Sequence, residues 1–525
     1  MEEMEEVVKA YDELIELDID LPYWVHDAAA SAYLFLKDPK KAIELYQIAL
    51  ELKPDRFDTR MGLYHAYVEA GKFGKAEEVL DELKKITPDW IFDRGLNRYN
   101  WNKQSIIVEK GWWFAYQDRM KEALKYFREL RTVAPANLST RTGVAQTSAW
   151  RGWPHSAQED IDIVITMAGK QTYPLAEFEQ EREMAAKNAR IFALNNNYLK
   201  NEAREYGGQL LDRNPKNLHT QRINRQLDIE DSTEFFLDAL WTDEDPGARE
   251  YYLYTQLIQP VTPLFDLYAY WLRRSISIEE IGDLVEEEEE EHSRAGAGAV
   301  WDFLPKLTLK GEVSYDAGTR DNEGFMTRLM YRANDYWTFD AGHSTFSLEV
   351  PIRARAAGVE GELTDGSVAF RSSELFEMRA YTGVHELDDG NESYSYGLFA
   401  ERALITRAAV RTRLFAEAFY TENSETNVPY FSPENTTTFL LEHMLQHTIY
   451  RRHDHAFVHR LFFGAGQYDQ ELFDPEFIWH ARYEHDYLFN DKTALLWGVN
   501  FRRRFYDAEE TDIISWYLTY KQNFW

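Results

Sequence analysis

Residues 476–525 alternate between apolar and polar positions with a period of two. From Phe477 to Phe489 the odd positions are mostly aromatic, whereas the charges of this stretch stand at even positions. This alternation predicts β-strands with one apolar and one charged face. Two similar segments follow, and the sequence runs to Phe524 and Trp525. Soluble sandwich strands are about 5–6 residues long. Segments of about 10 or more residues, rimmed with Trp and Tyr, are typical of strands that cross a bilayer.

The same alternation extends back through the second half of the chain. Counting one or two strands around 282–301, we expect about sixteen strands in a closed antiparallel transmembrane β-barrel over residues 247–525. Closure leaves no strand edge unpaired in lipid. Besides the three segments after 476, the predicted strands are 249–257, 264–274, 306–315, 324–333, 336–346, 366–372, 375–384, 393–403, 409–420, 437–450 and 455–468.

The first half instead repeats with a period of 34 residues, a spacing that predicts paired helices. A third unit follows an insertion at 90–101, a fourth comes 34 residues later, and a weaker fifth includes Pro215. The pattern resembles the tetratricopeptide repeat. We therefore expect a helical superhelix over 1–235 and a linker at 236–246. The clearest recurrence is that of Tyr33, Ala42, Ala49 and Pro54 as Tyr67, Ala76, Leu83 and Pro88.

Two sets of residues are candidate binding surfaces. Aromatic and polar side chains at the groove-facing positions of the repeats either stack on sugar rings or pack on the next repeat. Charged residues on one face of the strands point into a barrel lumen, or to solvent if the fold is a sandwich. The groove set is Trp24, Ser31, His65, Trp112, Tyr116, Gln146 and Trp150. The lumen set is Glu250, Asp266, Glu312, Glu377, Arg379, Arg411, Arg413, Glu417, Glu442, Arg482, Glu484 and Asp486.

Composition narrows the functional classes. The net charge of −32 argues against nucleic acid, because phosphate binding needs a basic surface. It fits a cationic ligand or a solubilising surface. The absence of cysteine excludes disulfides and thiol chemistry. There is no run of about 18 apolar residues for a membrane helix. The acidic, amphipathic start differs from a signal peptide, so we expect an exported form to have an additional amino-terminal segment.

The sequence gives little support for a catalytic site. His443 and His447 are separated by roughly 13 Å if they stand on a strand, too far to share a metal ion. Glu484 and Asp486 form a carboxylate pair of the kind used in glycoside hydrolysis, but such pairs are expected by chance in an acidic chain. We therefore expect no enzyme activity, no metal and no cofactor.

Three segments resemble the barrel of the outer-membrane export porins for poly-β-1,6-N-acetyl-D-glucosamine, the PgaA type. They are Val428-Pro429-Tyr430-Phe431-Ser432-Pro433-Glu434-Asn435, Leu441-Glu442-His443 and Tyr450-Arg451-Arg452. The resemblance implies that the barrel lies in the outer membrane of a Gram-negative bacterium and is inserted by the barrel-assembly machinery. It also implies periplasmic repeats that engage a deacetylase and a partly de-N-acetylated exopolysaccharide exported for biofilm formation. The repeat region is shorter than is usual in that family.

Two alternatives remain. A cellulose-type exporter would carry a neutral glucan and would need fewer inward carboxylates. A soluble repeat scaffold with a β domain would retain the repeats but would have no lipid-facing aromatic bands.

Overall fold

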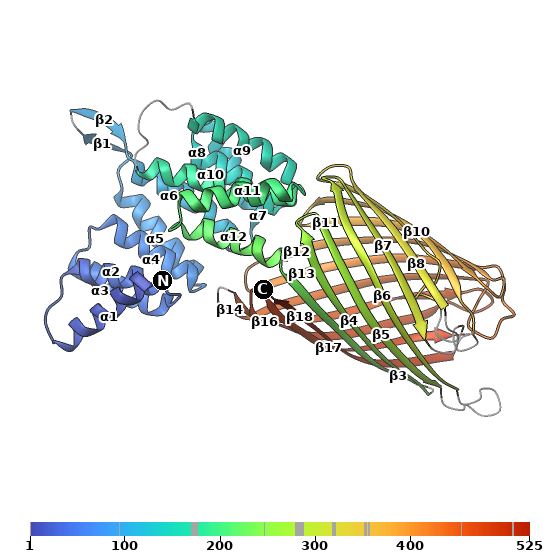
Figure 1. Cartoon of the computed structure of the whole chain (residues 1–525). Helices are drawn as coiled ribbons and strands as arrows, with labels where there is room; N and C mark the ends of the chain where they lie inside the picture. The colour runs from blue at the N-terminus through green and yellow to red at the C-terminus, as the bar shows by residue number, and fades with distance from the viewer. Residues whose placement is uncertain are drawn as a thin grey trace. The chain divides into compact units, whose positions relative to one another are not determined.

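The computed structural model describes residues 2–93, 95–169, 177–245, 247–278, 288–317, 322–350, 354, 358–452, 454–506 and 509–524 (Figure 1). The chain divides into two compact units, residues 1–147 and 148–525. No helix in these described ranges is both long enough and apolar enough to cross a membrane.

Unit 1 consists of paired helices, as the 34-residue period predicted. Local signals set the helix ends: the Asp38 side chain accepts a hydrogen bond from the Lys41 amide, and Pro39 occupies the first turn of α3. The insertion at 90–101 forms a two-stranded hairpin that periodicity did not reveal. The elements are α1 (Glu2–Glu16), α2 (Tyr23–Phe35), α3 (Pro39–Leu52), α4 (Phe57–Glu69), α5 (Phe73–Ile86), β1 (Trp90–Asp93), β2 (Leu96–Tyr99), α6 (Trp101–Tyr116), α7 (Met120–Val133) and α8 (Leu138–Trp150), whose last residues belong to unit 2.

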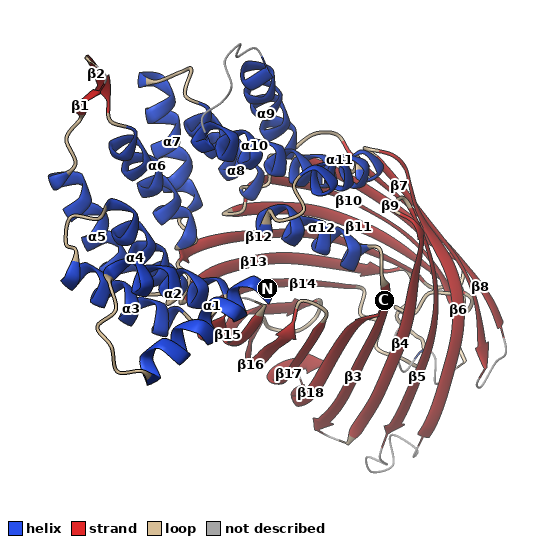
Figure 2. Cartoon of the chain, turned by 60° about the vertical axis from the view of Figure 1, so that its left-hand side comes forward, coloured by secondary structure: helices blue, strands red, loops and turns tan. Residues whose placement is uncertain are grey.

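Unit 2 contains four further helices and the barrel, in which each strand pairs antiparallel with its neighbours in sequence. The last strand pairs with the first, since Trp516 lies opposite Trp241, and this pairing closes the sheet (Figure 2). The helices are α9 (Pro154–Gly169), α10 (Glu177–Asn196), α11 (Lys200–Arg213) and α12 (Leu218–Glu230). The strands are β3 (Thr233–Asp245), β4 (Ala248–Thr262), β5 (Phe265–Ile278), β6 (Glu288–Leu304), β7 (Leu307–Ala317), β8 (Asn322–Arg332), β9 (Trp337–Ser344), β10 (Gly361–Ser373), β11 (Phe376–Leu387), β12 (Glu392–Thr406), β13 (Val410–Asn423), β14 (Asn435–Arg452), β15 (His455–Gln470), β16 (Glu476–Asn490), β17 (Thr493–Tyr506) and β18 (Glu509–Phe524).

The predicted number of sixteen strands is confirmed, but the prediction of a linker at 236–246 is wrong. Residues 233–245 form β3, and the described part of 282–301 belongs to one strand, β6. The segment Phe235–Trp241 carries Asp238 as its one polar residue, so the period of two is weak there. The turn signal after it marks the β3–β4 hairpin, where Gly247 adopts a φ of +89°. Helix therefore gives way to strand between Glu230 and Thr233.

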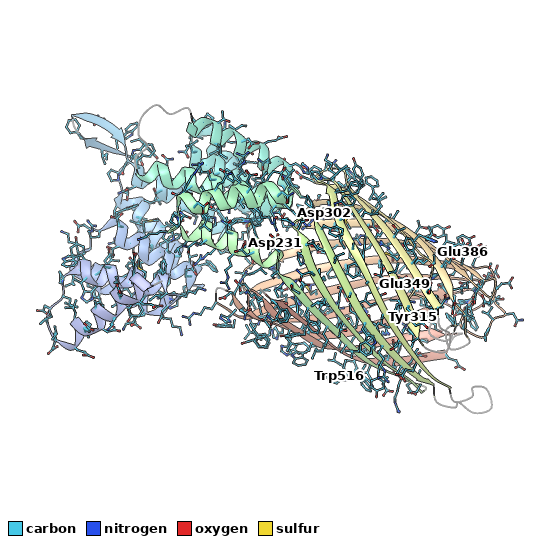
Figure 3. The ribbon with its side chains drawn as sticks, in the orientation of Figure 1. Asp231, Asp302, Tyr315, Glu349, Glu386 and Trp516 are labelled. Atoms are coloured by element: carbon cyan, nitrogen blue, oxygen red, sulfur yellow. The ribbon has the colours of Figure 1, made fainter. Side chains whose placement is uncertain are left out.

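The two ends of the barrel differ. At the short-turn end, where α12 leads into β3, hairpins such as Asn490–Thr493 and Leu304–Leu307 are tight. At the opposite, long-loop end, the β9–β10 connection runs from Ser344 to Gly361. Asp231 and Asp302 lie at the short-turn end, whereas Glu349 and Glu386 lie at the long-loop end (Figure 3).

Candidate functional site: the barrel lumen and its short-turn mouth

Contacts that skip a strand identify the inward face of the barrel. Tyr268 and Tyr270 on β5 both donate to Glu312 on β7, at 2.7 Å each. His480 on β16 likewise lies 2.5 Å from Glu442 on β14. Side chains two strands apart converge on the concave side of a curved sheet, so these residues point into the lumen. Residues of the opposite parity include many exposed apolar side chains, among them Leu309, Val313, Phe325, Leu398, Phe439, Leu461, Phe463, Trp497, Phe501 and Trp516.

The strand register places all the candidate lumen residues on this inward face. On β11 and β13, for example, Glu377, Arg379, Arg411, Arg413 and Glu417 have the same parity as the inward Tyr381 and Phe415. The same holds for Glu250 and Asp266, which alternate in step with Tyr252 and Tyr268, and for Glu442, Arg482, Glu484 and Asp486 on β14 and β16.

Tyrosine hydroxyl groups hold three of the lumen carboxylates. Besides the Glu312 pair, Tyr381 donates to Glu417 at 2.7 Å and Tyr517 donates to Glu484 at 2.8 Å. A neutral phenol fixes the orientation of a carboxylate and leaves its negative charge in place. These three positions therefore combine a charge, a hydrogen-bond acceptor and an adjacent ring.

Cationic side chains accompany other lumen carboxylates. Arg460 bridges Glu484 at 3.3 Å and Asp486 at 2.6 Å, and Arg482 approaches Glu484 and Glu442 at 3.3 and 3.9 Å. Between β5 and β4, Arg274 pairs with Glu250 at 2.5 Å. The lumen is therefore lined by both negative and positive groups. Of the three carboxylates held by tyrosines, Glu312 lies 3.8 Å from Lys310 and Glu484 is paired with arginines, whereas Glu417 makes no ion pair among the described residues.

A buried charge cluster ties the β9–β10 loop into the lumen. The Arg294 guanidinium pairs with Asp316, whose side chain is fully buried, and donates to the Phe346 carbonyl oxygen at 3.0 Å. His292 lies 3.1 Å from the same carboxylate. Sequence periodicity did not point to these residues, because the contact joins β6, β7 and a loop that have no common periodicity.

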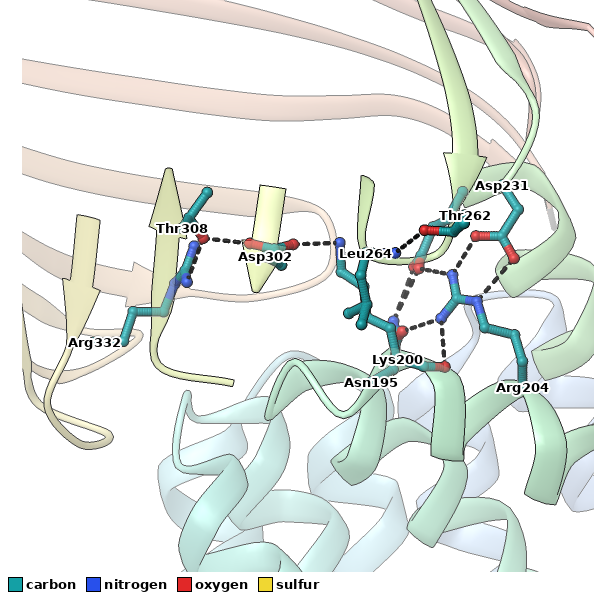
Figure 4. Close-up of polar contacts among 10 residues, drawn as sticks. Asn195, Lys200, Arg204, Asp231, Thr262, Leu264, Asp302, Thr308 and Arg332 are labelled. Carbon is teal, nitrogen blue, oxygen red and sulfur yellow. Dashed lines mark hydrogen bonds and ion pairs between the residues drawn. The ribbon is translucent and has the colours of Figure 1, made fainter. Parts of the chain in front are cut away.

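The last helices contact the short-turn mouth of the barrel. Arg151 pairs with Glu374 of the β10–β11 turn at 3.0 Å, and the carboxylate of Asp335, in the β8–β9 turn, accepts hydrogen bonds from the His155 and Ser156 amides at 3.0 and 3.2 Å. That carboxylate caps the first turn of α9. Farther along the rim, Lys200 donates a hydrogen bond to Asp302 at 2.8 Å. Asp302 also accepts a hydrogen bond from the Thr308 hydroxyl group, which in turn accepts one from Arg332 (Figure 4).

Of the groove candidates in unit 1, Trp112 packs within its own repeat, with its ring 4.8 Å from that of Phe127. Trp24 is 61% exposed and Tyr116 is 44% exposed. His65 stands beside Tyr64, whose hydroxyl group lies 3.4 Å from the Glu109 carbonyl oxygen. Gln146, on α8, is half-buried, as is Trp150 at the end of that helix, which belongs to unit 2.

Glu109, on α6, is a residue that the repeat pattern did not single out. Its Oε2 atom is buried without a hydrogen-bond partner among the described residues, and burial raises the carboxyl pKa to about 7. Burial also lowers the pKa of His65 to about 4. Both groups are therefore held in an environment that disfavours charge.

The helical repeats and the barrel each resemble a known family. A family profile described as the PgaA membrane beta barrel domain matches residues 283–522, and a tetratricopeptide repeat profile matches residues 36–91. The poly-beta-1,6-N-acetyl-D-glucosamine export proteins of Escherichia coli strains K12 and O157:H7 are each 20% identical to this chain over 527 residues. These alignments cover 96% of this chain and 62% of each relative, so the chain spans less than two thirds of their length.

One solved structure, described as a bacterial polysaccharide outer membrane secretin, superposes with a TM-score of 0.52 at 16% identity. The superposition covers 56% of this chain and 99% of the secretin chain. It supports the barrel fold. These findings confirm the predicted resemblance to the PgaA-type export porins.

Proposed function

We propose that this chain is an outer-membrane export porin that passes a partly de-N-acetylated poly-β-1,6-N-acetyl-D-glucosamine exopolysaccharide to the cell surface for biofilm formation. The observation that carries the proposal is the closed barrel with an inward face of oriented carboxylates, phenols and guanidinium groups. Its barrel profile and its named relatives point to the same polymer.

The orientation in the membrane follows from the two barrel ends. Outer-membrane barrels have short periplasmic turns and longer extracellular loops. We therefore place the short-turn end and the helical repeats in the periplasm. There the repeats engage the emerging polymer and the deacetylase, while lipid and the barrel-assembly machinery contact the outward face.

Transport in this proposal is passive guidance rather than catalysis. A lumen carboxylate within about 4 Å of a glucosamine ammonium contributes roughly 1–4 kcal/mol in a water-filled pore. Contacts of that size hold a chain without stalling it, because conduction requires that each site also release its ligand. The candidate lumen residues, from Glu250 to Asp486, supply such contacts along the wall.

Polymer export by a bacterial strain that lacks its own exporter tests the function. The test variant carries Glu417→Gln, Glu442→Gln, Glu484→Gln and Asp486→Asn. We expect it to secrete less de-N-acetylated polymer into the medium than the parent chain. The matched control removes four outward carboxylates and so makes the same change in net charge: Asp243→Asn, Glu362→Gln, Glu510→Gln and Asp512→Asn. Failure of the parent chain to restore secretion, although folded in the outer membrane, would refute the proposed function.

A further inference from the structure

A pocket of about 540 Å³ lies at the short-turn mouth, where two helical turns meet the inner wall of β8–β11. Gly152 approaches from the α8–α9 turn, His155 from the first turn of α9, and Tyr198 from the α10–α11 turn. The barrel contributes the side chains of Arg328, Met330, Arg332, Tyr336, Arg371 and Arg379. The volume is typical of a small-molecule site and is large enough for more than one sugar ring.

The walls of this mouth pocket are held in place from both sides. The Arg332 guanidinium lies 3.6 Å from the centroid of the Tyr198 ring and also donates to Thr308, which links it to the Lys200 and Asp302 pair (Figure 4). On the other side, the Trp153 indole donates to the Ser372 carbonyl oxygen at 3.0 Å. Tyr336, 40% exposed, leaves an aromatic surface open toward the pocket.

The carboxylates that line the mouth pocket already have partners. Asp335 caps α9 and contacts the His155 ring at 2.7 Å. Asp340 pairs with Arg328 through Oδ1, and its Oδ2 is buried without a hydrogen-bond partner among the described residues. Glu377 lies opposite Arg371 in the strand register, yet its carboxylate pairs with Arg379 at 3.4 Å.

Arg371 makes no ion pair among the described residues, although its backbone amide donates to the Tyr336 carbonyl oxygen at 2.8 Å. Four arginines and three carboxylates line the pocket, so its formal charge is not negative. An ammonium group entering the pocket would meet an unpaired guanidinium and no carboxylate without a partner. The pocket thus differs in charge from the surroundings of Glu417, whose carboxylate is held by the neutral Tyr381 and makes no ion pair among the described residues.

We propose that the mouth pocket binds the neutral, N-acetylated hexosamine units of the polymer. This assignment rests on the proposed function above. An acetamido group is uncharged and has one donor and one acceptor, which Arg371, Asn196 and Asn334 of the lining can satisfy. The apolar face of a sugar ring fits against Tyr336 and Met330. Acetylated units are selected at the mouth, and amine-bearing units interact with the tyrosine-held carboxylates farther inside.

Calorimetric titration of the purified full chain in detergent tests this assignment. The two probes are a fully acetylated β-1,6-N-acetylglucosamine hexamer and its fully de-N-acetylated counterpart. Met330→Trp fills the pocket, and we expect it to weaken binding of the acetylated hexamer about tenfold and to change binding of the other hexamer less than about twofold. Leu329→Trp is the matched control, because the neighbouring side chain points outward and should alter neither affinity.

Arg371→Glu provides a second, charge-based measurement that does not depend on filling the pocket. It adds a carboxylate beside Glu377 and should increase the affinity for the de-N-acetylated hexamer several-fold while weakening that for the acetylated one. Heat-modified migration on a detergent gel verifies that each variant is folded. Parent-like binding of both hexamers by Met330→Trp, equal losses for both, or no binding of the acetylated hexamer by the parent would overturn the assignment. If these results occur while the parent chain still restores secretion, the pocket assignment fails and the export function stands.

Discussion

Removing the charge of Glu417 should make the pore less cation-selective without changing its shape. Tyr381 lies across Gly397 of the intervening strand to reach the Glu417 carboxylate, and a Cβ at that glycine would clash with the phenol ring. A glutamine at position 417 retains an oxygen that accepts the same hydrogen bond. Glu417→Gln therefore isolates the contribution of one negative charge.

The expected size of the effect follows from the surroundings. The hydrogen-bond partner of Glu417 is the neutral Tyr381, so the substitution leaves no cation unpaired. A monovalent cation about 4 Å away loses roughly 1 kcal/mol of attraction at the dielectric constant of water and about 4 kcal/mol at an effective value of 20. In a water-filled lumen we expect a value near the lower figure.

The assay is the reversal potential of single barrels in a planar bilayer under a potassium chloride gradient. Glu417→Gln should move it toward zero, whereas Tyr381→Phe, which retains the charge, should not. Glu484→Gln should move it farther, because Arg460 and Arg482 then lose a negative neighbour. At 1 M salt, where the screening length is about 3 Å, the differences should shrink.

The matched control is Glu422→Gln, on the outward face of the same strand. An unchanged reversal potential for Glu417→Gln, or an equal shift for Glu422→Gln, would refute the role of the inward carboxylate.

Three further predictions concern other parts of the chain. Val499→Arg places a charge on the outward face and should destabilise the barrel in lipid vesicles by about 2–4 kcal/mol if the site lies near the bilayer centre. Asn500→Arg, on the inward face, should destabilise the barrel less. Equal unfolding curves for the two variants would argue against lipid contact. Because the Glu109 pKa in the folded chain is about 7 against an ordinary 4.5, the unfolded chain loses its proton first, and the stability of unit 1 should fall as pH rises from about 4.5 to 7. Glu109→Gln should remove this pH dependence of stability. At pH 8 it should increase the amide-exchange protection of α4 and α6 by at most about 3 kcal/mol, and at pH 4 it should give no gain. Asp335→Ala removes the cap of α9 and should cost about 1 kcal/mol, seen as faster exchange of the first α9 amides; exchange at the parent rate would show that the cap is dispensable.

Much of the architecture was predictable from periodicity alone. Side chains alternate across a strand, so the register of charges on β11, β13, β14 and β16 already divided inward from outward positions. The 34-residue spacing likewise predicted the paired helices, because small residues must recur wherever two helices approach closely. One strand was missed because the middle of β3, Phe235–Trp241, has Asp238 as its one polar residue, which makes the period of two hard to detect.

The tertiary structure decided which of these residues act together. Tyr381 reaches Glu417 by crossing a glycine on the strand between them, and Arg294 reaches Asp316 and a loop carbonyl oxygen far away in sequence. Such pairings depend on barrel curvature and strand register, which no local pattern specifies. The mouth pocket depends even more on the tertiary structure, since residues from 149 to 379 line it. Its charge balance depends on which carboxylates are already paired: the barrel strands pair Asp340 and Glu377 with arginines, and the first turn of α9 supplies the partners of Asp335.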